Sequence, residues 1–298
     1  MKLGVIADDF TGATDIAGFL VENGLSTIQF AGIPAEADLT GVDAVVISLK
    51  SRSCPAGEAV RDSLAALDWL KARGCPRIYQ KYCSTFDSTA AGNIGPVTDA
   101  LLAALESTFT LICPALPVNG RTVYQGNLFV GAQPLAESGM RHHPITPMTD
   151  SNLLRLMEGQ AQGRAGLVPF NTIAQGPGAI ADAFEQLTQA GVRYAVVDTL
   201  TEQHLLDIAT AALDMPLVTG GSGLAIGLAR QLGSGDLQGA REAGWPRGTR
   251  AAVLTQAVTP QQCAAVDFLR EVSGRPAPAA DLRVEARAIG DSIQIHGT

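Results

Sequence analysis

The sequence has few charged and few aromatic residues, and it has no long apolar run. Of its 298 residues, 17% are charged and 5% are aromatic, whereas 46% are hydrophobic. No apolar run is long enough to span a bilayer, and the N-terminal MKLGVIADDF turns acidic before any signal-peptide core could form. These absences argue against a membrane protein and predict a cytoplasmic one.

Cysteine is also scarce, and positive charge is outnumbered. The five cysteines form no Cys-x-x-Cys pair, so we expect free thiols in a reducing compartment: Cys54, Cys75, Cys83, Cys113 and Cys263. The net charge of −8 opposes binding to nucleic acid or to anionic lipid, so neither is an expected partner. An anionic small substrate would therefore need a local cluster of cations.

What the sequence does have is a regular alternation of strands and helices. Short apolar segments alternate with helical patterns, and such units predict a parallel sheet covered on both faces. We therefore expect an α/β fold with a doubly wound, largely parallel sheet in three layers. The predicted strands are Lys2–Ile6, Thr27–Phe30, Ala44–Leu49, Arg77–Lys81, Phe109–Cys113, Gly166–Pro169, Tyr194–Asp198 and Leu217–Thr219.

The alternation stops between Pro114 and Asp150. This stretch is rich in proline and glycine but also carries aromatic and apolar residues, which argues against disorder. We interpret it as an ordered, irregular active-site segment.

Two domains are expected. Residues 1–235 would form the first, and residues 236–298 the incomplete start of a second α/β domain. In the second we predict a linker (234–248), a strand (250–254), a helix (261–271) and a weak strand (292–295).

Ligands of open α/β sheets bind at the carboxyl ends of the strands, so the loops there are the candidate sites. Asp8 and Asp9 follow the first strand. Capping a helix needs one carboxylate, and the second is a candidate base or Mg²⁺ partner. A second loop, Lys81–Thr89, combines the cation Lys81 with the carboxylate Asp87 and several hydroxyls, and it continues through Gly92–Gly95. The alternative interpretation is a polar turn that caps a helix.

The irregular segment holds the third group of candidates. Arg121, Arg141, His142 and His143 are its cationic or potentially cationic side chains between Arg121 and His143, and arginine forks match carboxylates. They are candidates for holding an acidic substrate, although a solvated surface loop is the alternative. No third ligand lies at a suitable spacing from the histidine pair, so we expect no zinc site.

A glycine-rich run precedes the last predicted helix of the first domain. Gly220, Gly221, Ser222 and Gly223 lack the Gly-Lys-Ser/Thr of a Walker A loop. Two interpretations stay open, an anion cradle for phosphate and a tight turn with close helix packing.

Several runs together resemble one family. Residues 5–15 (VIADDFTGATD) resemble the N-terminal signature of the four-carbon acid sugar kinases. Residues 81–89 with 92–95, 117–126 and 137–150 resemble the 3-oxo-tetronate kinase branch, and residues 217–223 resemble the family's glycine-rich segment. The resemblance extends to about Arg250. It implies a sugar-acid-binding N-terminal domain, a C-terminal domain with most of the ATP site, and Mg²⁺-ATP-dependent phosphorylation of the acid's terminal hydroxyl.

With this resemblance, we assign hypothetical roles. Catalytic candidates are Asp8, Asp9, Lys81 and Asp87. Candidates for substrate binding are Thr11, Gly12, Ser84, Arg121, Tyr124, Gln125, Arg141, His142 and His143. Candidates for nucleotide binding are Gly220, Gly221, Ser222 and Gly223, and no resident metal site is assigned.

The resemblance ends after Leu254. The family expects a Ser-Gly-Ser-Cys-Ser-like run there and two later ATP-associated loops, whereas this sequence reads TQAVT at 255–259 and ends at Thr298. A second hypothesis is therefore a sugar-acid-binding domain without catalysis. A third is a hydrolase or aldolase with Lys81 as a Schiff-base lysine. The choice among 3-oxo-tetronate, erythronate and threonate stays open, as does assembly into a homodimer.

Overall fold

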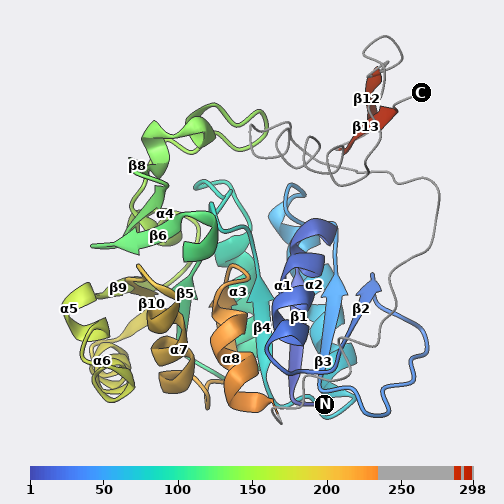
Figure 1. Cartoon of the computed structure of the whole chain (residues 1–298), viewed down its shortest axis with the longest axis horizontal. Coiled ribbons are helices and arrows are strands. Elements are labelled where there is room, and N and C mark those ends of the chain that lie inside the picture. The colour runs from blue at the N-terminus through green and yellow to red at the C-terminus, as the bar shows by residue number, and fades with distance from the viewer. Residues whose placement is uncertain (234–284, 290–291, 297–298) are drawn as a thin grey trace, which may run out of the picture. The chain divides into compact units, whose positions relative to one another are not determined.

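The computed structural model describes residues 1–233, 285–289 and 292–296. Residues 1–233 form an eight-stranded sheet in the order β2-β3-β1-β4-β11-β5-β10-β9, and every neighbouring pair is parallel (Figure 1). The strands are β1 (Leu3–Ala7), β2 (Thr27–Ala31), β3 (Ala44–Ser48), β4 (Ile78–Lys81), β5 (Thr110–Cys113), β9 (Arg164–Val168), β10 (Val192–Val197) and β11 (Leu217–Gly220).

Helices cover both faces of this sheet. On one face α8 packs against α1 and α7, and α7 packs against α6; on the other α3 packs against α2 and α4. Right-handed crossovers explain the division, because connections that run in opposite directions along the sheet lie on opposite faces. The helices are α1 (Phe10–Glu22), α2 (Ala56–Lys71), α3 (Ile94–Ala104), α4 (Leu153–Glu158), α5 (Phe170–Ile173), α6 (Pro177–Gln189), α7 (Glu202–Ala211) and α8 (Leu224–Leu232).

The centre of the sheet is the core of the protein. Every residue of β1, β3, β4, β5 and β11 is buried, whereas β2 and β9 at the two edges are only partly buried. Strands covered on both faces read as continuous apolar runs, which is why the sequence identified them. The predicted doubly wound, three-layer α/β fold is confirmed.

The prediction of an irregular segment between Pro114 and Asp150 is wrong in part. It contains a three-stranded antiparallel sheet of β6 (Arg121–Tyr124), β7 (Asn127–Val130) and β8 (Gln133–Pro134), together with the 3₁₀ turns η1 (Pro117–Asn119), η2 (Leu135–Glu137) and η3 (Gly139–His142). Gln125 and Gly126 join β6 to β7 with φ values of 49° and 70°. Two successive residues with positive φ are typical of a tight hairpin, but Gln is rare at such a position, so the turn was not recognised.

This small sheet is attached to the large one through Asp198, which follows β10 and is fully buried. Its carboxylate accepts hydrogen bonds from the backbone N–H groups of Gln125 (2.9 Å), Gly126 (2.9 Å) and Phe170 (2.8 Å). An antiparallel bridge between Val123 and Thr199 adds a second attachment. The hairpin is therefore held at the carboxyl edge of β10.

The described residues near the C-terminus form a separate hairpin. β12 (Glu285–Ile289) pairs antiparallel with β13 (Ser292–His296), so the predicted strand at 292–295 is confirmed. The predicted linker at 234–248, strand at 250–254 and helix at 261–271 lie outside the described residues, and the domain boundary at 235 stays a prediction. None of the described helices is both long and apolar enough to cross a membrane.

Candidate active site

Three of the predicted loops meet at the carboxyl edge of the large sheet. β1, β4, β11 and β5 are consecutive neighbours, and their last residues are in register: Ala7 with Lys81, Lys81 with Gly220, and Gly220 with Cys113. The loops that follow them therefore start side by side. Parallel strands impose this arrangement, because all their carboxyl ends lie at one edge.

The two adjacent aspartates have different partners. Asp9 caps α1: its backbone is extended (φ −148°, ψ 164°), and its Oδ1 accepts the Gly12 N–H at 2.9 Å. Asp8 instead forms a bidentate ion pair with Arg52, with Nε to Oδ2 and Nη2 to Oδ1 both at 2.8 Å. Arg52 Nη2 also reaches Asp9 Oδ1 at 2.7 Å.

Arg52 is a site residue that the sequence analysis missed. It lies in the loop after β3, and β3 is the neighbour of β1 on the side away from β4. The rule that ligands bind in the loops at the carboxyl ends of the strands therefore applied to this loop as well. The signal was a single arginine in a short polar loop, SRSC, at residues 51–54.

Lys81 is the last residue of β4 and is only 4% exposed. Its Nζ lies 3.9 Å from Asp9 Oδ1. The described cluster thus contains the carboxylates Asp8 and Asp9 and the cations Arg52 and Lys81. The opposite charges in this cluster lower the energetic cost of burying its members.

Burial and charge shift the pKa values of the two carboxyls in opposite directions. Burial would raise the pKa of Asp8, but the Arg52 guanidinium outweighs it and the pKa lies below its usual value. For Asp9, burial dominates and raises the pKa, with the Asp8 charge adding to the effect. Burial would lower the pKa of Arg52, but the negative charges around it, Asp8 above all, raise this pKa by more than burial lowers it. Arg52 therefore stays protonated.

The loop after β4 holds Asp87 in an uncommon backbone conformation. Phe86 and Asp87 have φ values of 65° and 40°, in the left-handed region that non-glycine residues seldom adopt. Thr85 donates to Asp87 Oδ1 at 2.7 Å, and burial raises the pKa of the Cys83 thiol to about 11. Ser84 in this loop is partly exposed.

The glycine-rich run is buried and packed against the residues that follow β5. A Cβ added at Gly220, Gly221 or Gly223 would lie 2.3, 2.5 or 2.4 Å from the carbonyl oxygens of Cys113, Pro114 and Ala115, respectively. Ser222 is 2% exposed and donates to Asp15 of α1. Close packing accounts for these glycines, and nucleotide contact at them stays a prediction.

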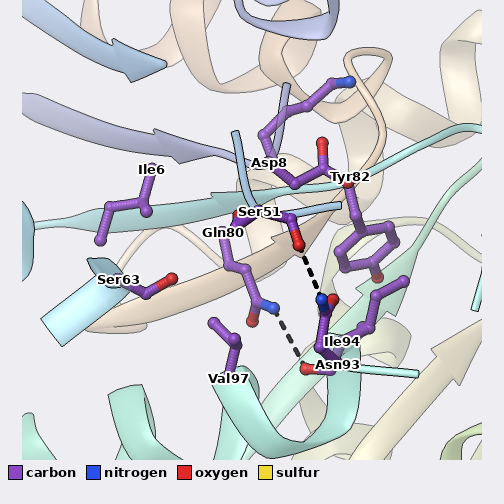
Figure 2. A pocket seen from close by; sticks show the side chains of 10 residues that line it. Ile6, Asp8, Ser51, Ser63, Gln80, Tyr82, Asn93, Ile94 and Val97 are labelled. Atoms are coloured by element: carbon purple, nitrogen blue, oxygen red, sulfur yellow. Dashed lines mark hydrogen bonds between the residues drawn. The ribbon is translucent and has the colours of Figure 1, made fainter. Parts of the chain in front are cut away.

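A small cavity lies beside Asp8, lined by residues of β1, β4 and α3. Figure 2 shows Asp8, Ser51, Gln80 and Asn93 among the side chains that line it. Its volume of about 20 Å³ suits a single water molecule. A cavity of this size is too small for a four-carbon acid.

The remaining predicted residues are not seen to contact this cluster. Arg141 donates to the Ala136 carbonyl at 3.1 Å, and His143 Nδ1 accepts from the Thr146 N–H at 3.0 Å, so both bond within their own segment. His142 and Thr11 are exposed. Tyr124 is 44% exposed and packs edge-on against Phe170.

Arg121 differs from these exposed groups. It donates to the Asn119 carbonyl, and its Nε is buried with no hydrogen-bond partner in the described part of the chain.

No group of three or more His, Cys, Asp or Glu residues in the described part of the chain could hold a metal ion.

The chain is similar to known proteins over most of its length. Residues 3–228 match the family model described as a sugar-binding N-terminal domain. A curated 3-oxo-tetronate kinase of Salmonella typhimurium is 59% identical over 284 residues, which cover 95% of this chain and 67% of the relative. The chain belongs to the four-carbon acid sugar kinase family. The chain spans about two thirds of the length of the Salmonella kinase.

Solved structures of similar proteins share the fold. One from Salmonella typhimurium LT2 is 60% identical, has a TM-score of 0.82, and is matched over 91% of this chain and 64% of that chain. Another, from Bordetella bronchiseptica, is 28% identical with a TM-score of 0.64, and the match covers 90% of this chain and 65% of that one. The Bordetella protein is described as a domain-swapped dimer with bound citrate.

Proposed function

We propose that this chain is a cytoplasmic, ATP-dependent kinase that phosphorylates the terminal hydroxyl of a four-carbon sugar acid, with residues 1–235 binding the acid. 3-Oxo-tetronate is the first substrate to test, because it names the similar Salmonella kinase. The observation that carries the proposal is the convergence of Asp8, Asp9 and Lys81 at the carboxyl edge of adjacent strands, beside the glycine-rich run.

The residues at this edge suit phosphoryl transfer, which depends mainly on positioning and on charge stabilisation. Asp8 or Asp9 would accept the proton of the substrate hydroxyl or contact Mg²⁺. Carboxylate oxygens are the donors that Mg²⁺ prefers, and Mg²⁺ usually takes one or two of them together with nucleotide phosphates. Bound with ATP, the ion would neutralise phosphate charge. Lys81 and Asp87 would lie beside the substrate.

The acid itself needs cations and hydrogen-bonding groups. We propose that Arg121 holds the substrate carboxylate, since its buried Nε has a free donor, and that the His142/His143 region with Arg141 supports it. Citrate in the Bordetella structure is consistent with carboxylate binding in a related protein. Thr11, Ser84, Tyr124 and Gln125 are the candidates for contacts to the acid's hydroxyls.

The test is ADP release from Mg²⁺-ATP with 3-oxo-tetronate, erythronate and threonate in turn. Turnover with one acid supports the kinase and identifies its substrate. A rise in melting temperature with an acid but no turnover would favour the alternative of a sugar-acid-binding domain without catalysis. Size-exclusion chromatography with light scattering would test whether this chain, like the Bordetella relative, forms a dimer.

A further inference from the structure

Arg52 uses both oxygens of Asp8. Its Nε and Nη2 donate to Oδ2 and Oδ1, each at 2.8 Å, in the parallel geometry that makes arginine–carboxylate pairs strong. The same Nη2 also donates a hydrogen bond to Asp9 Oδ1 at 2.7 Å. Asp8 is therefore engaged by its ion pair before any ligand arrives.

The hydrogen bonds to Asp9 leave one oxygen available. The Gly12 N–H and Arg52 Nη2 both donate to Oδ1, and Lys81 Nζ lies nearest that same atom. No described residue donates a hydrogen bond to Oδ2. Asp9 is thus fixed through one oxygen and can use the other.

The loop that carries Arg52 is held in place from two sides. Asn93 Nδ2 donates to the carbonyls of Ser51 (2.7 Å), Cys54 (3.1 Å) and Arg52 itself (3.3 Å). The N–H groups of Ser51 and Arg52 donate to the Asp8 carbonyl at 2.9 and 3.1 Å. Such bracing orients the guanidinium toward the aspartates before a ligand binds.

A partly buried ion pair of this kind is a poor means of stabilising a fold, because desolvation offsets much of its attraction. The Arg52 side chain is 20% exposed, and those of Asp8 and Asp9 are 16% and 9% exposed. The arrangement is better explained by a task at the sheet edge. It divides two neighbouring carboxylates into one that is held and one that can react.

We infer that Arg52 is a positioning residue for the proposed phosphoryl transfer: it immobilises Asp8 and directs Asp9, whose free Oδ2 is the group that meets the substrate hydroxyl or Mg²⁺. This inference rests on the proposed function for its kinetic consequences. The division of the two carboxylates is a property of the protein alone and can be measured without turnover.

The charged groups that face Asp9 come from three elements. Asp8 precedes it in the loop after β1, Arg52 follows β3, and Lys81 ends β4. Loss of the Arg52 charge leaves Asp8 and Asp9 side by side with Lys81 as the remaining cation, so the pKa of Asp9 should rise.

The test compares Arg52→Gln, Arg52→Lys, Asp8→Asn and Asp9→Asn with the unaltered chain. Arg61→Gln is the matched control, because Arg61 is exposed on α2 and, among the described residues, forms an ion pair only with its neighbour Asp62. In the kinetic arm, Arg52→Gln should lower kcat about 100-fold, with the KM for the acid changed less than about threefold. The acidic limb of the kcat–pH profile of Arg52→Gln should move to higher pH, because the Asp9 pKa is expected to rise. Arg52→Lys keeps the charge but not the fork, so its kcat should be intermediate.

Asp9→Asn should lose more activity than Asp8→Asn. An amide oxygen at position 8 still accepts from Arg52, whereas an amide at position 9 keeps the helix cap but cannot act as a base. We expect about 1000-fold and about 10-fold losses in kcat, respectively. In the second arm, ¹³C NMR titration of the aspartate carboxyls, with Asp9 assigned by its absence in Asp9→Asn, should show a higher Asp9 pKa in Arg52→Gln than in the unaltered chain.

Three results would overturn the inference. Asp8→Asn could cost as much kcat as Asp9→Asn, or Arg52→Gln could leave the Asp9 pKa unchanged. Alternatively, Arg52→Gln could raise the KM for the acid while kcat stays constant, which would make Arg52 a substrate ligand. If the unaltered chain releases no ADP with any acid, the proposed function fails, and the NMR arm alone decides whether Arg52 divides the two carboxylates.

Discussion

Lys81 Nζ occupies the space that a side chain at position 12 would need. A Cβ built on Gly12 would lie 1.9 Å from that nitrogen and 2.4 Å from Asp9 Oδ1. Gly12 was selected from the sequence as a substrate-binding residue. The structure gives it a steric role, since its missing side chain lets the buried lysine approach the N-terminus of α1.

Gly12→Ala should therefore displace Lys81 from Asp9. We expect a loss of about 1–3 kcal/mol in the free energy of unfolding, because the added methyl group overpacks a buried site. Urea denaturation measures this loss. Gly18→Ala in the same helix is the control, since nothing lies within 4 Å of its Cβ, and it should stabilise the protein by up to about 1 kcal/mol. Equal effects of the two substitutions would refute the steric role.

Asp198→Ala should detach the β6–β7 hairpin. It leaves three backbone N–H groups without their acceptor, and hydrogen bonds to a charged group are worth about 1.5–3 kcal/mol each, so we expect a loss of at least about 3 kcal/mol. Thermal and urea unfolding would measure it. Asp182→Ala on the exposed face of α6 is the control and should change stability by less than about 0.5 kcal/mol. A loss no larger than that of the control would count against the anchoring role.

Arg121→Ala should raise the KM for the sugar acid about 10- to 100-fold and leave the KM for ATP nearly unchanged, because a lost bidentate contact to the substrate carboxylate affects one substrate only. Steady-state kinetics with each substrate varied in turn gives both values. Arg155→Ala removes an exposed arginine that is paired with Asp150 and serves as the control. Equal losses for both substrates would contradict the assignment.

The carboxyls of Asp8 and Asp9 should affect the pH dependence of the free energy of unfolding in opposite directions. The pKa of Asp8 lies below its ordinary value of 3.8 in the folded state, so Asp8 contributes stability above 3.8 that is lost as the pH falls through the folded pKa. The pKa of Asp9 is raised, so its contribution is present below 3.8 and is lost as the pH rises through the folded pKa.

Urea denaturation at a series of pH values separates the two contributions. Asp8→Asn should flatten the loss of stability below pH 3.8, whereas Asp9→Asn should remove the decline on the alkaline side of that value. Profiles of both variants parallel to that of the unaltered chain would show that neither carboxyl is shifted in the folded state.

The sequence by itself determined the local elements and the type of fold. Fully buried strands such as β1 and β3 read as continuous apolar runs, and Pro and Gly mark the ends of helices, so each element follows from a few consecutive residues. The rule that loops follow the carboxyl ends of parallel strands selected Asp8, Asp9 and Lys81, and the structure places all three in one cluster. These inferences needed only local patterns and a general property of α/β sheets.

Only the tertiary structure decided which distant groups meet. β11 is inserted between β4 and β5, which brings Gly220 beside Lys81 across 139 residues of chain, and no periodicity encodes that order. Arg52 and Asp198 were missed for the same reason, since their partners lie 44 and 73 residues away. A charged side chain shows its role only once burial has removed water and left a specific partner, and both conditions arise when the sheet is assembled.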